Sequence, residues 1–450
     1  MAGQGSGASV ADGGQVNSLL QINDMDYRIP PALSVVNKRS HGRYPAGHPI
    51  TNQGQTLQFT FASGAQYINA RNSYLAFDVE LTGAPGAPAR TYYLGSKPDG
   101  NVGAVGASCP GALALFSGFR YIHSGGQVLD ELVTDLDLIS YQNAMHSKDE
   151  NWRKSVGSLF GGLHPDNSLS FVSAAGNTFV PPRQRVIVPL CLISDIFDQD
   201  QLSPSFLMSG SRLDLQLNTF AQAFQADQDD PNVRFVITGA EVYLEQYQLT
   251  EAVGKTLASI SATSGLEIPF ISTHINPVTA SVNQQSIQVT RALSRVNNVA
   301  LMIRESVKLN NLTADGIGTR NVPEDVRFQV QLGGQYIPIM EVLGQRETLQ
   351  MSLVTQNDYM RGLTAGVRLR DFTGKPTTLA RTIQSASLGR YAITLESSSS
   401  LAQSGSALSA QRVLIFNIYG LGDTEQSRFV LAARHVTLAT IFLDSVVVRS

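Results

Sequence analysis

Residues 55–81 read QTLQFTFASGAQYINARNSYLAFDVEL, and their pattern decides the class of fold. In two runs of this stretch, Leu57–Phe61 and Leu75–Leu81, large apolar residues recur at every second position, and Asp78 and Glu80 lie between them. A period of two is typical of a strand with one buried and one exposed face. The stretch therefore predicts two strands of a sheet that covers an apolar core.

The composition of the whole chain extends this prediction to an all-β protein. Only 15% of the 450 residues are charged, whereas roughly 25% is usual for soluble domains. The chain also holds 39 glycines. Long exposed helices depend on Glu and Lys, while uncharged polar faces and frequent turns suit strands. Apolar residues make up 42% of the chain, enough for sizeable cores, and the length favours two or three domains.

Later segments carry the same signals. A glycine-centred hairpin is expected within 119–129, because glycine supplies the backbone angles of a tight turn. Thr134 and Asp137 resemble a helix-capping arrangement, and the apolar spacing that follows predicts one short helix over 134–146. Apolar alternation predicts further strands at 184–192, 211–217 and 233–248.

This order of features returns about 200 residues later, which indicates an internal repeat. The hairpin RYIHSGGQVL at 120–129 corresponds to FQVQLGGQYI at 328–337. Helix-compatible segments follow both hairpins, at 134–146 and 346–361. The paired strands are 211–217 with 411–417, and 233–249 with 434–447. Because three features keep their order and spacing, we expect two copies of one β-fold.

A unit of this size, with about eight strands and long loops, suits a jelly roll, in which two four-stranded sheets pack face to face. We therefore predict two tandem eight-stranded jelly rolls with short helices in loops. The tail before them has no lysine or arginine ahead of Arg28, which disfavours a nucleic-acid-binding arm. The expected parts are a flexible tail at 1–27, a first jelly roll at 28–250, a linker at 251–265 and a second jelly roll at 266–450.

Three passages together resemble a known family. They are 55–81, quoted above, LFSGFRYIHSGGQVLDELVTDLDLISYQN at 115–143, and VIVPLCLISDIFDQDQLSPSFLMSGSRLDLQL at 186–217. Their succession of strands, turns and short helices is similar to that of the double jelly-roll major capsid proteins of tailless DNA viruses, especially polinton-like viruses and virophages. The passages cover the first half, and the repeat links the second half to it.

This resemblance implies a structural protein without enzymatic activity, located in the virion. Chains of this family form homotrimeric, pseudo-hexagonal capsomers that tile an icosahedral shell, with penton and minor capsid proteins as further partners. Two alternatives from other classes stay open. A carbohydrate- or receptor-binding jelly roll, such as a spike or lectin-like module, would need an aromatic platform or calcium site. A β-sandwich glycoside hydrolase would need two carboxylates facing each other across a cleft.

Charge, cysteine content and hydropathy exclude other classes. The net charge of −3 gives no overall attraction to nucleic acid, so we expect no sequence-specific nucleic-acid binding. Cys109 and Cys191 are too few for a disulfide framework, which favours two buried thiols and assembly in a reducing compartment of the host cell. The N-terminus lacks the pattern of a signal peptide. The longest apolar stretch, 102–116, is shorter than a bilayer span, so no transmembrane segment is expected.

Candidate metal and nucleotide sites fail on spacing. The motif His164-Pro165-Asp166 has no nucleophile elbow beside it and favours a turn. Gly254-Lys255-Thr256 resembles the end of a phosphate-binding loop, but Leu249 stands where its first glycine is required. No pair of histidines or cysteines has metal-ligand spacing. The seven histidines are His41, His48, His123, His146, His164, His274 and His435.

Acidic and aromatic candidates favour structural roles as well. The run 227–230 lacks the spaced ligands of a calcium loop. A glycosidase pair among Asp195, Asp198 and Asp200 depends on a separation in space that sequence does not provide. We therefore predict no catalytic, cofactor-binding or metal-binding residue and no cofactor. Two remaining candidates are the glycosylation sequon that begins at Asn311, which matters only in a secretory lumen, and Trp152, expected to anchor a helix end.

Overall fold

In the computed structural model, most of the regular secondary structure is antiparallel β-sheet. It describes residues 36–61, 67–83, 89–97, 110–148, 150–174, 178–198, 203–204, 210–263, 265–280, 284–289, 296–314, 327–332, 335–343, 347, 414–419, 426–441 and 446–449.

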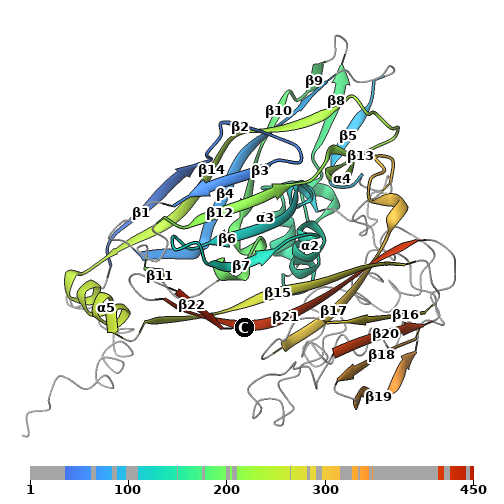
Figure 1. The fold of residues 1–450 in the computed structure, drawn as a ribbon. Helices are drawn as coiled ribbons and strands as arrows, with labels where there is room; N and C mark the ends of the chain where they lie inside the picture. The colour runs from blue at the N-terminus through green and yellow to red at the C-terminus, as the bar shows by residue number, and fades with distance from the viewer. Residues whose placement is uncertain are drawn as a thin grey trace, which may run out of the picture.

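The first half of the chain forms three sheets (Figure 1). Sheet A has the order β1 (Val36–Pro45), β14 (Arg234–Leu249), β4 (Tyr67–Thr82) and β10 (Arg183–Pro189), with β2 (Ile50–Asn52) beside β14 and β11 (Ser203–Pro204) beside β4. Sheet B has the order β3 (Thr56–Thr60), β12 (Arg212–Leu217), β6 (Phe116–Ile122) and β7 (Val128–Leu132). Sheet C has the order β13 (Phe224–Ala226), β5 (Thr91–Leu94), β8 (Ser170–Ala174) and β9 (Thr178–Val180).

The second half repeats the strand order of sheets A and B. Sheet D has the order β15 (Leu266–Ala280), β21 (Ser427–Ile441) and β17 (Val296–Glu305), with β22 (Val446–Arg449) beside β21. Sheet E has the order β16 (Gln284–Gln288), β20 (Leu414–Tyr419), β18 (Arg327–Leu332) and β19 (Gln335–Leu343). In both halves, the strand late in the chain lies between two early ones. The predicted all-β architecture and its internal repeat are therefore confirmed.

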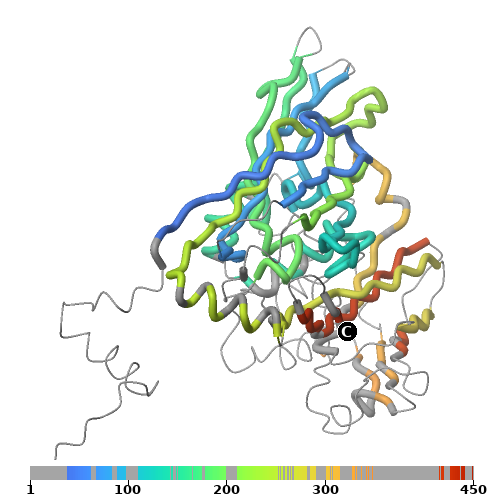
Figure 2. The backbone as a smooth tube through the Cα atoms, turned by 60° about the vertical axis from the view of Figure 1, so that its left-hand side comes forward, coloured from blue at the N-terminus to red at the C-terminus, as the bar shows by residue number. Residues whose placement is uncertain are grey.

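Short helices lie between the strands, as predicted. In the described part of the chain, the α-helices are α2 (Leu136–Ser147), α3 (Glu150–Gly157), α4 (Phe220–Ala223) and α5 (Glu251–Thr263). The short 3-10 helices are η2 (Gly111–Leu115), η3 (Pro165–Asn167), η4 (Leu190–Leu192), η5 (Asp195–Phe197) and η7 (Ser306–Lys308). Figure 2 shows α5 joining β14 to β15 at one end of the molecule. Among the described residues, no helix is both long enough and apolar enough to cross a membrane.

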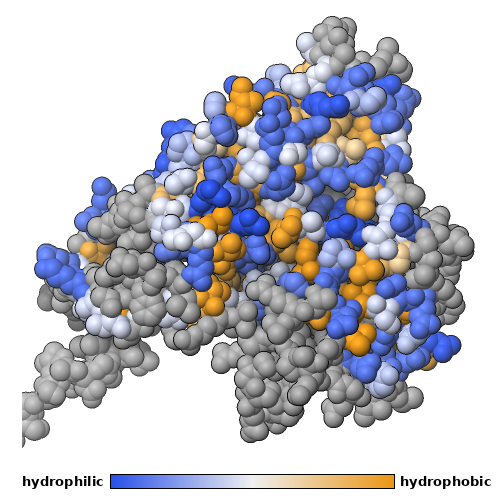
Figure 3. All heavy atoms as spheres, viewed as in Figure 1, coloured by the Kyte–Doolittle hydropathy of each residue, from blue (hydrophilic) through white to orange (hydrophobic). Residues whose placement is uncertain are grey.

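The alternating apolar residues within 55–81 lie on two strands, β3 and β4, as predicted. Phe59 on β3 and Phe77 on β4 are fully buried, whereas Asp78 and Glu80 lie half-buried on the other face of β4. Phe77 meets Phe116 of β6 edge-on, with ring centroids 5.9 Å apart, so sheets A and B share an apolar core. On the surface in Figure 3, hydrophobic residues are interspersed among hydrophilic ones, as is ordinary for a folded protein.

The predicted hairpin forms between β6 and β7, with Gly126 at a φ of 81°. The predicted helix cap does not form as expected. Helix α2 is preceded by Asp135, whose φ of 58° lies in the left-handed region, and the Thr134 hydroxyl donates to the Asp135 carboxylate at 3.0 Å. Asp137 instead accepts a hydrogen bond from Arg304 of the second half. A buried carboxylate is strongly destabilising unless a cation pairs with it.

Several predicted boundaries are wrong. The strand expected over 184–192 ends at Pro189 and is followed by η4. The second-half strands expected over 411–417 and 434–447 are β20, which ends at Tyr419, and β21, which begins at Ser427. The helix-compatible segment 346–361 lies outside the described residues apart from residue 347.

The sequence alignment of the two hairpins also fails in one respect. It superposes Arg120 on Phe328, yet Arg120 is exposed and Phe328 is fully buried. The pairing of β6 with β7 shifts register after Tyr121, whereas that of β18 with β19 shifts after Phe328. A shift of one residue in the strand pairing moves side chains to the other face of the sheet. Residues at equivalent positions of the two repeats therefore need not both be buried.

Candidate functional site

Sheet D packs against the first half, and this junction is the most elaborate polar site in the described part of the chain. Strand β15 lies against β7 (Figure 1) and also contacts η5. Phe270, Met302 and Val430 of the second half belong to the same apolar cluster as the core of the first half. The two halves therefore share a continuous core at the junction.

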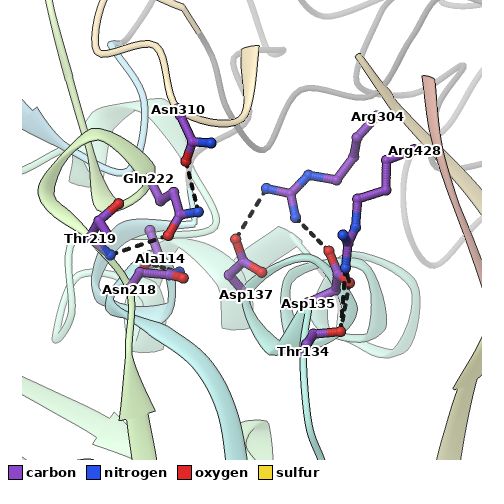
Figure 4. Close-up of polar contacts among 10 residues, drawn as sticks. All are labelled: Ala114, Thr134, Asp135, Asp137, Asn218, Thr219, Gln222, Arg304, Asn310 and Arg428. Atoms are coloured by element: carbon purple, nitrogen blue, oxygen red, sulfur yellow. Dashed lines mark hydrogen bonds and ion pairs between the residues drawn. The ribbon is translucent and has the colours of Figure 1, made fainter. Parts of the chain in front are cut away.

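Two arginines of sheet D reach into the start of α2 (Figure 4). Arg304 donates through Nη1 to Asp135 at 3.0 Å and through Nη2 to Asp137 at 3.3 Å. Arg428 donates to the second oxygen of Asp135 at 2.6 Å. The left-handed backbone of Asp135 turns the chain from β7 into the helix and brings both carboxylates to the same side. Two acids and two arginines form a network that is neutral as a whole.

The side chains of Arg304 and of both acids are at most 5% exposed, so burial acts strongly on their charges. Burial would raise the pKa of Asp135, but Arg304 and Arg428 outweigh it and lower that pKa below its ordinary value. Burial raises the pKa of Asp137, and the negative charge of Asp135 raises it further. Arg304 lowers this pKa, but its contact with Asp137 is longer than its contact with Asp135. The network is thus anchored mainly by Asp135.

A second polar contact ties α4 to the segment after η7 (Figure 4). The Gln222 side chain donates to Asn310 at 3.0 Å and accepts from the Thr219 backbone N–H at 3.2 Å. The Ala226 backbone N–H donates to the Leu312 carbonyl oxygen at 2.8 Å. Hydrogen bonds from two separate regions therefore restrain the same half-to-half arrangement.

Asp130 on β7 bridges the halves through hydroxyl groups. One of its oxygens accepts from the Ser272 hydroxyl of β15 at 2.7 Å, and the other accepts from the Ser194 hydroxyl of the first half. Burial raises the pKa of Asp130 to about 6, against the opposing effect of these two hydroxyls. A charged carboxylate at this position is therefore costly at neutral pH.

A cavity of about 340 Å³ lies beside Asp130, between the two halves. Arg434 of β21 and Asp195 both line it and form an ion pair. Cys191 also lines the cavity as a half-buried free thiol, and burial raises its pKa to about 11. A thiol with so high a pKa stays protonated and is a poor nucleophile. Cys109 lies outside the described residues.

The acidic residues singled out from sequence are paired with cations. Asp195 pairs with Arg434, and Asp198 lies 3.3 Å from Arg71 and 4.0 Å from Lys148. Asp200 lies outside the described residues. Since Asp195 and Asp198 each have a cationic partner, this part of the cavity offers no facing pair of free carboxylates.

Two acidic residues of the run 227–230 also have cationic partners. Asp227 pairs with Lys97, and Asp230 accepts from the Tyr92 hydroxyl at 2.8 Å and from Arg90 at 3.0 Å. In the described part of the chain, no group of three or more histidine, cysteine, aspartate or glutamate side chains could hold a metal ion.

The remaining candidates occupy local structural positions. His164 lies 3.3 Å from Asp166 in the turn around η3. Lys255 lies within α5 and pairs with Glu251 one turn earlier. The Trp152 ring lies under the Lys148 ammonium, with 5.3 Å from nitrogen to ring centroid, and packs on the core.

The glycosylation sequon at Asn311 forms a turn that is closed by hydrogen bonds to the Asn311 side chain. The Asn311 side-chain oxygen accepts from the Thr313 backbone N–H at 3.0 Å and from the Thr313 hydroxyl at 2.7 Å. Both residues are exposed.

Sequence reasoning missed the arginines of the junction. Arg304 follows the apolar run Leu301-Met302-Ile303, and alternation places it on the same face as Met302. A charged residue on an otherwise apolar strand face is a signal of a buried partner. That signal identifies Arg304 as unusual, but it does not identify Asp135 and Asp137 as its partners.

Comparisons with known proteins bear on the fold. No protein-family description matches the sequence, and no curated protein is similar to it. Solved structures are similar at 10% sequence identity. The Faustovirus major capsid protein matches with a TM-score of 0.57 over 94% of this chain and 94% of that one. The Sputnik virophage structure solved by cryo-EM matches with a TM-score of 0.56 over 100% of this chain and 92% of that one.

The mavirus major capsid protein matches with a TM-score of 0.51 over 100% of this chain and 95% of that one. These neighbours are double jelly-roll proteins. Together with the repeated strand order, they confirm that this chain has two tandem jelly rolls.

Proposed function

We propose that this protein is a major capsid protein, a structural building block that assembles as a homotrimer into the shell of a virion. The observation that carries the proposal is the match of nearly the whole chain to nearly the whole length of viral capsid proteins with the same double jelly-roll fold. A fold alone can serve many functions, so the geometry of the junction has to support the role as well.

The junction supports it because shell building needs a rigid block. A tile keeps its outline only if its two halves hold a constant angle. Here a shared core, the Arg304 network and the Gln222–Asn310 contact restrain that angle from separate positions. With two similar halves per chain, three chains supply six similar units, which is the geometry of a pseudo-hexagonal tile.

The rival functions gain no support from the described residues. A glycoside hydrolase would need two free carboxylates across a cleft, yet Asp195 and Asp198 are paired with cations. A calcium-dependent lectin would need oxygen ligands in a loop, yet Asp227 and Asp230 are engaged by Lys97 and Arg90. We therefore favour a role without catalysis.

The finer parts of the account belong to the same proposal. We take 1–27 as a tail, 28–250 as the first jelly roll, 251–265 as the linker and 266–450 as the second jelly roll. Sheets A to C lie within the first range, α5 lies within the linker, and sheets D and E lie within the last range. Penton and minor capsid proteins would complete the shell. The free Cys191 thiol fits assembly in a reducing compartment.

Light scattering on the purified full-length chain tests the proposal. We expect one stable species with a mass three times 48.4 kDa, or larger assemblies built from it. A species that stays at 48.4 kDa over the accessible concentration range would contradict the proposal. In that case, a glycan-binding screen would test the binding-module alternative.

A further inference from the structure

The cavity at the junction has the size of a small-molecule site. Its volume is about 340 Å³, and Asp130 is part of its wall. The wall combines β6, β7, α2 and η4 of the first half with β15 and β21 of the second. Small-molecule pockets span roughly 300–1,000 Å³. One water molecule needs about 10–15 Å³, so the cavity has room for an organic ligand.

Much of this wall is apolar. Six large apolar side chains, each at most 7% exposed to solvent, come from β6, β7, α2, η4 and β15. An alkyl chain placed against them would leave water, which favours binding. The six residues are Phe119, Leu132, Leu136, Ile139, Leu192 and Phe270.

The four acids in the wall differ in their partners. Three of them form ion pairs with arginines, which balance their charges. Asp130, which is 4% exposed, accepts hydrogen bonds from the hydroxyls of Ser194 and Ser272. The ion pairs are Glu131 with Arg120, Asp195 with Arg434, and Asp198 with Arg71.

A cation beside Asp130 would offset the cost of its buried charge. Burial raises the pKa of Asp130 to about 6, and the negative charge of Asp195 also raises it. A carboxylate has about four lone-pair sites, so it can accept an ammonium N–H in addition to its two serines and the Glu131 backbone N–H. The hydroxyls of Ser140 and Thr273 place further acceptors in the same wall. The cavity therefore suits a ligand with a positive head and an apolar tail.

We propose that this cavity binds a small primary amine with a short alkyl chain, whose ammonium pairs with Asp130 while the chain lies against the apolar wall. The bound amine contacts both halves, because β7 and β15 both contribute to the wall. A ligand that binds only the folded junction stabilises the folded state. Binding of the amine goes beyond the capsid role and does not depend on it, because the site lies within one chain.

Isothermal titration calorimetry on the purified full-length chain at pH 7 tests the site. The probes are hexylamine, 1-hexanol and hexanoate, which share an alkyl chain and differ in the charge of the head group. We expect hexylamine to bind at least about tenfold more tightly than 1-hexanol, and hexanoate to bind most weakly, because the Asp130 carboxylate attracts an ammonium and repels a carboxylate. Hexylamine that binds no more tightly than 1-hexanol would overturn the proposal.

Two neighbouring acids on β7 provide matched variants, both checked for folding by circular dichroism. Asp130→Asn removes the charge and keeps the size of the side chain, so we expect the affinity for hexylamine to fall at least about tenfold. Glu131→Gln removes the same charge from the same wall, but Glu131 already pairs with Arg120, so the affinity should change less than about twofold. Equal losses in the two variants would show that the amine responds to overall charge and would overturn its pairing with Asp130.

A pH series on the wild-type chain gives a result even if Asp130→Asn does not fold. Between pH 7 and pH 5, Asp130 takes up a proton because its pKa is about 6, whereas a primary amine stays charged. We expect the affinity for hexylamine to fall about tenfold over this range and the affinity for 1-hexanol to stay constant. A constant affinity for hexylamine would contradict the ion pair.

Other groups near Asp130 also carry or gain charge. Asp130 lines an adjoining groove of about 360 Å³ as well as the cavity. Protonation of a histidine there would act on the wild type and on Asp130→Asn alike, so a larger fall in the wild type identifies Asp130. Besides the acids and Arg434 named above, the titratable groups described in the two walls are Lys148, Cys191, His274 and His435.

Photo-crosslinking locates the bound amine. A hexylamine analogue with a diazirine at the end of its chain is irradiated with the full-length chain, and labelled peptides are identified by mass spectrometry. We expect labels on peptides that contain β6, β7, α2, η4 or β15, and we expect excess hexylamine to suppress them. Labels confined to other peptides would overturn the site even if the amine binds.

Discussion

At the scale of single residues, Arg304 is the side chain on which the junction most depends. Substituting methionine leaves Asp137 without its arginine and Asp135 with Arg428 alone, inside a site that is at most 5% exposed. Removing one partner of a buried ion pair typically costs about 3–5 kcal/mol. We expect Arg304→Met to lower the free energy of unfolding by this amount in chemical denaturation.

The control for Arg304→Met is Arg120→Met on β6. Arg120 also pairs with a carboxylate, Glu131, but its side chain is 51% exposed. An exposed pair contributes about 0–1 kcal/mol, so this variant should unfold close to the wild type. If the two substitutions lower the free energy of unfolding equally, burial does not increase the contribution of the Arg304 network to stability.

Asp130 predicts a pH dependence of opposite sign to that of an ordinary ion-paired acid. Its pKa is about 6 in the folded chain against 3.8 for an unperturbed aspartate, chiefly because of burial. Between these values the folded state holds a proton that the unfolded state has lost, so the stability that this group contributes falls as pH rises from 4 to 6. The difference amounts to at most about 3 kcal/mol.

Asp130→Asn removes this titration while keeping a polar side chain between Ser194 and Ser272. We expect the variant to gain stability relative to the wild type as pH rises through this window, measured as unfolding midpoints at a series of pH values. Parallel pH profiles for the two proteins would contradict the buried-charge account of Asp130.

At the scale of elements, the β6–β7 hairpin provides a matched glycine pair. Gly126 has a φ of 81°, and an added Cβ there would meet no atom within 4 Å, so backbone conformation alone resists a side chain. We expect Gly126→Ala to cost about 1–2 kcal/mol, seen as a lower thermal midpoint. Its neighbour Gly125 has no such angle, and an added Cβ would lie 3.7 Å from His123. If Gly125→Ala is as damaging as Gly126→Ala, the left-handed turn is not what requires glycine.

The same elements show how far sequence could predict the fold. Alternation located β3, β4, β12 and β14 because each strand buries one face. It did not locate the true start of β21 at Ser427, because apolar residues fill both of that strand's faces: Phe429 and Leu431 lie on one, Val430 and Ala432 on the other. The hairpin repeat was found from its glycines, but its buried face shifted because the two register shifts occur at different residues.

The candidate site was less accessible to sequence for a related reason. Arg304 and Asp135 lie 169 positions apart, and they meet only because sheet D packs on α2. A local pattern can mark Arg304 as an unexpected charge, but its partner depends on how the halves are placed. The pairing of the acidic residues was hidden from sequence in the same way, because the cations that neutralise them come from distant strands, as Arg434 does for Asp195.

At the scale of the whole molecule, the account depends on two similar halves held at a constant angle. Each half contains two sheets whose strand order recurs in the other half, sheets A and B in the first and sheets D and E in the second. Within the chain the two halves meet where β15 of sheet D lies against β7. In the proposed homotrimer, three chains would place six similar halves around one axis.

Negative-stain imaging of the purified full-length chain, with class averages computed without imposed symmetry, tests this claim most directly. The account predicts particles with a hexagonal outline, true threefold symmetry and six similar densities around the axis. Averages that show isolated two-lobed particles, or rings with a number of lobes other than six, would contradict it.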